Sequence, residues 1–336
     1  MDKLELNFNE IINMIETRRN NAYKKVNEEL ISLYWDFGKY ISEKVNDSNW
    51  GDKIVDKLVE FMKREYPTMR GFNKRGIYRM KQFYETYRDF PFVSPLVTQI
   101  SWTNNLLILS GTNSIEEKEF YIKMCIKNNY SKRELDRQIS SGYFHRYMLS
   151  DGKANQSLSK TVGEEDYPNT KLLDTYSLEF LDLPNSYSEK DLKKAIISNM
   201  RDFILEIGND FSFVGEEYKV QVGNEDFYID LLFYNRTLSC LVAFELKIGK
   251  FKPEYISKMD FYLEALDRQE KKENENPSVG VILCASKDVQ VVEYAMSRSM
   301  SPTMVSQYTL KLIDKKLLEE KLKEINDIVE ENNNKE

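Results

Sequence analysis

The sequence predicts a helical N-terminal domain followed by an α/β domain, and three observations support this division. The chain has 336 residues, whereas single domains usually have about 100 to 200. Its first half repeats apolar residues at helical spacing, and short apolar runs alternate with helical stretches after residue 210. Between them, the stretch SDGKANQSLSKTVGEEDYPNT has the composition of a linker. We therefore expect a helical domain at residues 1–150, a linker at 151–170 and an α/β domain at 171–336.

Helical spacing and capping signals predict the helices of the N-terminal domain. Ser114 precedes Glu117 by three residues and Ser131 precedes Glu134 likewise, which is the spacing of capping boxes. The stretch PFVSPLVTQISW contains two prolines and predicts a break in the helical pattern. The expected helices are 7–46, 50–67, 74–88, 114–128 and 131–149.

In the α/β domain, signals for helices and strands alternate along the chain. Ser188 and Asp191 suit the start of a helix, and Pro253 suits the first turn of another. The run VGVILCA is wholly apolar, as in a strand that is buried on both faces. The expected strands are 211–222, 226–234, 240–248, 279–285 and 304–309. The expected helices are 188–207, 254–270, 288–299 and 311–332.

Composition narrows the class of protein. With 41% apolar and 31% charged residues, the chain is predicted to be folded and soluble. It has no run of about 18 apolar residues and no N-terminal secretion signal, which predicts a cytoplasmic protein without a membrane segment. Three widely spaced cysteines predict no disulfide framework. Because His145 is the only histidine, a metal site here would use oxygen ligands.

Charge is divided unevenly between the two halves. Of the net charge of -7, residues 1–150 contribute +4 (24 basic, 20 acidic) and residues 151–336 contribute -11 (24 basic, 35 acidic). Residues 63–88 carry eight basic residues against Glu65 and Glu85, interleaved with tyrosine and phenylalanine. Phosphates attract lysine and arginine, and aromatic rings can stack on unpaired bases, so this window predicts nucleic-acid binding. A solvated helix face is the alternative interpretation. The residues proposed to contact nucleic acid are Lys63, Arg64, Arg70, Lys74, Arg75, Arg79 and Lys81, together with Lys250 and Lys252.

Three charged residues interrupt two apolar strands and need an explanation. Asp230 lies within FYIDLLFY, and Glu245 and Lys247 lie within LVAFELKIGKF. Side chains alternate faces along a strand, so Glu245 and Lys247 share a face. A hairpin turn at Asn235 to Leu238 would place Asp230 opposite Ala243, with Glu245 as its diagonal neighbour about 7 to 8 Å away.

This arrangement predicts a metal site on one face of the hairpin. Two carboxylates in an apolar sheet repel each other unless a cation lies between them, and Mg²⁺ prefers carboxylate and water oxygens. The small side chain of Ala243 would leave room for a hydrated ion, while the other face of both strands is apolar and packs. A salt bridge on a half-exposed hairpin is the alternative explanation.

The pattern Asp-x14-Glu-x-Lys resembles the PD-(D/E)xK nuclease superfamily. The segments FYIDLLFY, FELKIGKFKPEY and SKMDFYL resemble, more specifically, the YhcG family, in which a nuclease domain follows a helical domain of unknown function 1016. The segments LYWDFGKYI, GFNKRGIYRMKQFY and YSKRELDRQI resemble that helical domain. The resemblance implies an N-terminal all-helical domain and a C-terminal restriction-endonuclease-like αβββαβ domain.

The resemblance also implies metal-dependent hydrolysis of phosphodiester bonds. Asp230 and Glu245 would hold Mg²⁺ or Mn²⁺ with the Leu246 carbonyl, and Lys247 would orient water or stabilise charge. Lys258 and Tyr262 would support the site. The family pattern usually has a glutamate where this chain has Lys193 and a glutamine where it has Lys258. Either the missing carboxylate is replaced or the ion has fewer ligands; the candidate replacements are Glu189 and Glu206.

Three functions remain open at this point. The first is a metal-dependent endonuclease, acting on DNA in defence, recombination or repair. The second is an impaired nuclease fold that binds nucleic acid or assembles complexes, since Lys193 and Lys258 add positive charge near the site. The third is an interaction module that forms a homodimer through the helical or the nuclease domain, which is compatible with either.

Overall fold

The computed structural model describes residues 3–46, 52–150, 172–297, 299 and 301–333. Its contacts divide the chain into two compact units, Met1–Ile139 and Ser140–Glu336. The predicted linker, 151–170, lies outside the described residues. The division falls earlier than the predicted domain boundary because the last helix before residue 150 packs within the second unit. No helix among the described residues is long and apolar enough to cross a bilayer.

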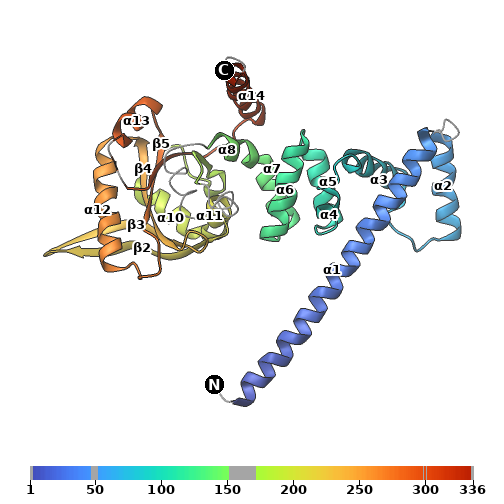
Figure 1. The fold of residues 1–336 in the computed structure, drawn as a ribbon, viewed down its shortest axis with the longest axis horizontal. Coiled ribbons are helices and arrows are strands. Elements are labelled where there is room, and N and C mark those ends of the chain that lie inside the picture. The colour runs from blue at the N-terminus through green and yellow to red at the C-terminus, as the bar shows by residue number, and fades with distance from the viewer. Residues whose placement is uncertain (1–2, 47–51, 151–171, 298, 300, 334–336) are drawn as a thin grey trace. The chain divides into compact units, whose positions relative to one another are not determined.

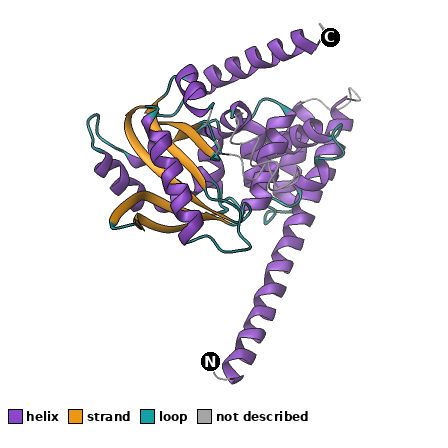
Figure 2. Ribbon diagram, turned by 60° about the vertical axis from the view of Figure 1, so that its left-hand side comes forward, coloured by secondary structure: helices purple, strands orange, loops and turns teal. Residues whose placement is uncertain are grey.

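The first unit consists of helices (Figures 1 and 2). The predicted helix at 131–149 is two helices, because Gly142 adopts a left-handed conformation (φ 63°) between them. The sequence patterns missed the helix α5, which begins in the predicted break, where Ser101 caps it. The helices are α1 (Lys3–Asn46), α2 (Asp52–Glu65), α3 (Lys74–Tyr87), α4 (Ser94–Val97), α5 (Trp102–Gly111), α6 (Ile115–Asn128), α7 (Lys132–Ser140) and α8 (Tyr143–Leu149), the last in the second unit.

The packing of α1 against α3 uses most of the aromatic residues in the basic window. Gly38 allows the close approach, since a Cβ there would lie 2.1 Å from the Met80 carbonyl oxygen. Phe83 is buried between Trp35 and Trp102, and Phe72 packs against Tyr34. These rings stabilise the helical core, so the prediction that the window's aromatics can stack on bases is wrong for the buried ones.

The second unit has the αβββαβ order predicted for its core, with additions at both ends (Figure 1). The predicted helix at 188–207 breaks at Asn199 into two. The short strand β1 was not predicted. The elements are β1 (Thr175–Ser177), the 3₁₀ helix η2 (Glu179–Leu181), α10 (Glu189–Ser198), α11 (Met200–Ile207), β2 (Phe211–Val222), β3 (Glu225–Asn235), β4 (Cys240–Lys250), α12 (Glu254–Gln269), β5 (Val279–Ser286), α13 (Val289–Met296), β6 (Thr303–Thr309) and α14 (Lys315–Asn333).

Six strands form one mixed sheet in the order β1-β6-β5-β4-β3-β2. The strands β2, β3 and β4 are antiparallel to one another, and β4, β5, β6 and β1 are parallel. Helix α12 covers one face, where Met259 packs in a cluster with Leu232 and Ala243. Helix α11 covers the other face, where Phe203 contacts Phe233 and Phe244. The strands that carry the charged residues therefore lie in the middle layer.

Candidate active site

The structure brings Asp230 and Glu245 onto neighbouring strands. The ladder of β3 and β4 pairs Asn235 with Cys240 and Leu231 with Phe244, and the same register continued by one residue sets Asp230 level with Glu245. The predicted register, with Asp230 opposite Ala243, is therefore wrong by two residues, because the turn begins after Asn235. A shift of two keeps every side chain on its face, so the two carboxylates still share a face.

The predicted role of Ala243 is also wrong. Its side chain is fully buried in the apolar cluster beneath α12 and leaves no room for a hydrated ion. Helices cover both faces of β3 after Tyr228 and of β4 before Lys247, whereas the start of β3 and the end of β4 are exposed. Asp230 and Glu245 instead lie midway along β3 and β4, one residue past Leu231 and Phe244, the last pair of the ladder between these strands.

Three lysines surround the two carboxylates. The Oε1 atom of Glu245 lies 2.8 Å from the Lys247 Nζ and 2.5 Å from the Lys258 Nζ. Asp230 Oδ1 accepts a hydrogen bond from Lys193 at 3.3 Å. Its Oδ2 accepts one at 2.9 Å from the backbone N–H of Leu246. The backbone of β4 therefore orients Asp230, while the lysines balance the charge of both acids.

All three lysines are held in the ammonium form. Burial lowers the pKa of Lys247, but its hydrogen bond with Glu245 and the nearby Glu189 outweigh this effect and leave the pKa above the ordinary 10.5. Burial also lowers the pKa of Lys258, but the hydrogen bond and ion pair with Glu245 outweigh this effect, so the pKa is raised. The pKa of Lys193 is raised for the same reason, through Glu217 and Asp230. At neutral pH these groups donate hydrogen bonds and cannot accept protons.

One oxygen of Glu245 is left without a partner. The residue is 1% exposed, and its Oε2 is buried with no hydrogen bond to the described residues, although both lysines crowd Oε1. A buried carboxylate oxygen in this state is costly unless a cation or a donor reaches it. No three His, Cys, Asp or Glu side chains in the described ranges lie together as a metal site. The Leu246 carbonyl accepts a hydrogen bond at 3.1 Å from Lys247, the same ammonium that contacts Glu245, so it lies beside the acids. Two carboxylates and a carbonyl are oxygen donors of the kind that Mg²⁺ prefers.

Of the two candidates for the missing carboxylate, one lies at the site and the other does not. Glu189 lies at the first turn of α10, and its Oε2 is 3.3 Å from the Lys247 Nζ, so it is at the site. Glu206 is wrong as a candidate. It is buried on α11, where it pairs with Arg146 and accepts a hydrogen bond from the backbone N–H of Ser177 at 2.7 Å. These contacts commit its carboxylate to α8 and β1, and β1 lies at the far edge of the sheet.

Of the other residues at the site, Tyr262 was predicted, whereas Glu217 and Tyr255 were missed. The Tyr262 hydroxyl donates to the Tyr228 carbonyl at 2.6 Å, which ties α12 to β3, and its ring lies under the Lys258 ammonium. Glu217 was missed; it binds Lys193 at 2.8 Å, and the register of β2 with β3 sets it level with Asp230. Tyr255, also missed, has its ring 5.4 Å from the Lys247 Nζ. An aromatic residue in the first turn of the helix after β4 was the available signal.

The proposed nucleic-acid contacts are exposed to different degrees. Lys74 pairs with Asp56 at 2.9 Å, and Lys81 is half-buried beside Glu85 at 2.8 Å. On the nuclease unit, Lys250 lies 3.9 Å from Asp288, and its neighbour Lys252 also faces a carboxylate. Arg79 is half-buried. The exposed members of the first unit are Lys63, Arg64, Arg70, Lys74 and Arg75.

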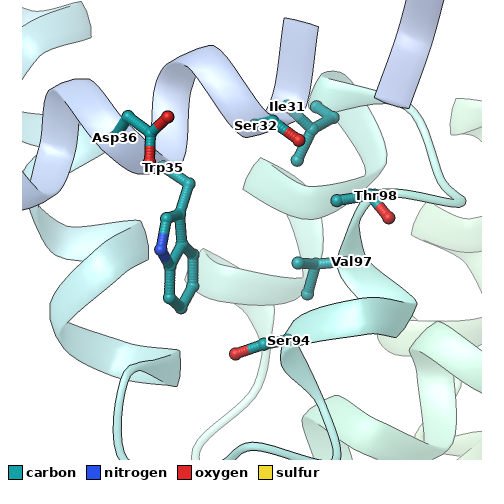
Figure 3. Close-up of a pocket in the computed structure, with 7 residues that line it drawn as sticks. All are labelled: Ile31, Ser32, Trp35, Asp36, Ser94, Val97 and Thr98. Carbon is teal, nitrogen blue, oxygen red and sulfur yellow. The ribbon is translucent and has the colours of Figure 1, made fainter. Parts of the chain in front are cut away.

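A separate cavity of about 240 Å³ lies in the helical unit between α1 and α4 (Figure 3). It is lined by Ile31, Ser32, Trp35, Asp36, Ser94, Val97 and Thr98. Asp36 is the only charged residue among them, so the lining offers no pair of groups for acid, base or nucleophilic chemistry.

The fold and the carboxylate and lysine cluster define a nuclease-like domain of the PD-(D/E)xK class, preceded by a helical domain. Comparison with known families agrees. Residues 169–323 match the YhcG PDDEXK nuclease domain, and residues 10–146 match the DUF1016 N-terminal domain. The two matches together cover most of the chain, so the chain carries a DUF1016 N-terminal domain followed by a YhcG-type PDDEXK nuclease domain. The predicted resemblance and fold class are confirmed.

A curated relative has the same extent as this chain. It is the protein of Escherichia coli (strain K12) named "Putative nuclease YhcG", which is 27% identical over 96% of this chain and 94% of its own length.

Two solved structures also align with part of the chain. One is a repair endonuclease from Pyrococcus abyssi, with 16% identity and a TM-score of 0.26 over 37% of this chain and 48% of its own. The other is a complex of EndoMS with double-stranded DNA, with 15% identity and a TM-score of 0.27 over 40% and 48%. The aligned parts span about half the length of those proteins.

Proposed function

We propose that this protein is a divalent-metal-dependent endonuclease that hydrolyses phosphodiester bonds in DNA. The observation that carries the proposal is the convergence of Asp230, Glu245 and Lys247 next to a buried, unpartnered carboxylate oxygen. In this proposal Asp230, Glu245 and the Leu246 carbonyl hold Mg²⁺ or Mn²⁺. The ion, when bound, supplies Lewis-acid chemistry, which polarises phosphate and lowers the pKa of water.

The side chains of this site have distinct tasks in the proposed reaction. The Leu246 N–H donates a hydrogen bond to Asp230 Oδ2 at 2.9 Å, which fixes the orientation of the Asp230 carboxylate. Lys247, a hydrogen-bond donor held between Glu245 and Glu189, would position water or a phosphate oxygen and stabilise the charge that develops there. Glu189 would steer the ammonium and is the carboxylate best placed to replace the one that family members carry at Lys193.

The N-terminal domain, residues 1–150, would bring nucleic acid or a partner to the nuclease domain, residues 171–336. Its exposed basic residues support this, because lysine and arginine attract phosphates, whereas the second half of the chain is acidic. The name of the EndoMS complex also contains double-stranded DNA, which supports DNA as the first substrate to test.

A cleavage assay tests the proposed function. The purified full chain is incubated with linear, nicked, branched and single-stranded DNA, and with RNA, in Mg²⁺, in Mn²⁺ and in EDTA. We expect cleavage of at least one DNA substrate with metal and none in EDTA. Cleavage that persists in EDTA would contradict the proposed metal dependence. Cleavage of RNA in preference to DNA would contradict the proposed substrate.

A second function is favoured by one observation, the pairing of Lys193 with Asp230 and of Lys258 with Glu245. In this alternative the ammonium groups take the place of the metal, and the fold binds nucleic acid or assembles complexes without turnover. Calorimetry separates the two functions. The nuclease should bind Mn²⁺ at millimolar concentration, whereas a protein that binds neither Mn²⁺ nor Mg²⁺ and cuts no substrate belongs to the alternative.

Replacing Lys258 by glutamine should tighten metal binding. The Lys258 ammonium lies 2.5 Å from Glu245 Oε1 and repels a divalent ion, so its removal should lower the Kd for Mn²⁺ by about tenfold. Lys250→Gln is the matched control, because Lys250 is exposed and lies 3.9 Å from its nearest carboxylate partner, Asp288. Titration calorimetry measures both variants. Weaker binding by Lys258→Gln would show that the lysine supports the ion rather than competing with it.

A further inference from the structure

The N-terminal part of α1 carries an apolar stripe that is open to solvent. Phe8 is 56% exposed, Ile12 52%, Ile15 48% and Val26 67%. This part of α1 runs beyond the other helices of its own unit (Figure 1). A helix that repeats large apolar side chains along one face is stable in water only when that face packs against another element. The stripe therefore indicates an interaction surface.

The spacing of the stripe is that of a coiled-coil seam. Its steps alternate between four and three residues, as a and d positions do. The spacing reads the same in both directions about residue 17. Its members are Phe8, Ile12, Ile15, Arg19, Ala22 and Val26, all exposed.

We propose that this stripe binds the same stripe of a second copy of the chain, with the two helices antiparallel about a twofold axis beside residue 17. Such pairing sets Phe8 level with Val26 of the second copy and Ile12 level with Ala22. These are the a-to-d layers of an antiparallel coiled coil. A twofold interface of this kind is self-complementary, as in most homodimers.

Charge decides the orientation. Arg19 is the one charged residue of the stripe, and a parallel pairing in register would place the two arginines against each other. The antiparallel pairing sets Arg19 level with Ile15 and beside Glu16 of the second copy, so each arginine meets a carboxylate. The same pairing sets the acidic Glu10 level with the basic Lys24, so the acidic and basic parts of the helix lie together.

The length of the exposed segment agrees with this axis. The helix begins at Lys3, and a centre at residue 17 sets residue 3 level with residue 31. The helix α1 meets the rest of its own unit at Asn27, whose side chain donates hydrogen bonds to the Thr98 and Ile100 carbonyls at 3.0 Å, and Ile31 beyond it is buried. The stripe ends at Val26, just before this contact. From Phe8 to Val26 it spans about three heptads, or roughly 27 Å of helix.

Sedimentation of the full chain tests the pairing. We expect a particle of twice the 39.7 kDa chain mass, with a dimer Kd at least about 100-fold weaker in Ile12→Glu/Ile15→Glu. Met14→Glu is the matched control, because Met14 is 64% exposed on the same helix but lies off the stripe. It should remain a dimer. A monomeric wild-type chain, or equal loss of dimer in both variants, overturns the proposal.

Cysteine crosslinking tests the orientation. The three native cysteines are buried, so an introduced thiol on α1 is the reactive one. A mixture of Ile12→Cys and Ala22→Cys chains should form a disulfide between the two variants on mild oxidation, and neither variant alone should crosslink efficiently. A disulfide between two Ile12→Cys chains would indicate parallel helices and overturn the antiparallel arrangement. The outcome does not depend on nuclease activity.

Discussion

Asp230→Asn is expected to abolish metal-dependent cleavage while leaving the fold intact. The asparagine keeps an oxygen that can accept the Leu246 N–H, but it lacks the charge that the ion and Lys193 require. Loss of one of two carboxylate ligands should lower the cleavage rate by about 1,000-fold or more. Initial rates of plasmid cleavage in Mg²⁺ provide the measurement.

Asp226→Asn is the control for this prediction. Asp226 lies on the same strand, partly exposed, and its ion pair is with Lys219 on β2, away from the lysines of the site. Its removal should change the rate by less than about threefold, because a surface pair contributes little. Circular dichroism should be the same for both variants and the wild type. A folded Asp230→Asn variant that cleaves DNA at the wild-type rate would contradict the assignment of Asp230 as a metal ligand.

Arg146→Met is expected to cause the largest loss of stability. The guanidinium is buried on α8, where it contacts Glu206 and donates hydrogen bonds to the Ser141 and Thr175 carbonyls at 3.0 and 3.1 Å. Methionine fills similar space but leaves the Glu206 carboxylate buried without this cation. Removing one partner of a buried ion pair costs about 3 to 5 kcal/mol in the free energy of unfolding.

Urea unfolding of the full chain, followed by far-ultraviolet circular dichroism, measures this loss. Arg236→Gln is the matched control, because Arg236 is exposed and 3.6 Å from Asp210. Its free energy of unfolding should change by less than about 1 kcal/mol. The prediction fails if Arg146→Met unfolds at the same urea concentration as the control. That result would mean that the buried pair contributes no more than an apolar contact.

Much of the fold was predictable because local patterns agree with it. Alternation and apolar runs identified the five main strands, and the capping box at Ser188 and Asp191 is present as predicted. Helix α5 was missed because its sequence, WTNNLLILSG, has apolar residues in a block rather than a stripe, as a helix buried among others can. At Asn199 the backbone leaves the helical conformation (φ -116°, ψ 32°), and the spacing of apolar residues does not indicate this break.

For the site, the sequence predicted which strands carry the charged residues and which face of the sheet they share, but not their neighbours. The alternation of side chains placed Asp230, Glu245 and Lys247 together, and a register error of two residues preserved that result. The burial of Ala243 was not predictable, since the sequence does not show that α12 covers the face. Glu206 could not be excluded either, because its partner Arg146 lies 60 residues earlier on another helix.

The order of residues along this chain was enough to predict its two domains, most of its helices and strands, and a pair of acids beside a lysine, because these follow from local spacing and motif. The pairing of each acid with a lysine, the unpartnered Glu245 oxygen and the exposed stripe of α1 emerged from the folded structure alone. The reason is physical. Burial, charge pairing and exposure depend on which distant segments come within a few ångströms, and spacing along the chain does not contain those distances.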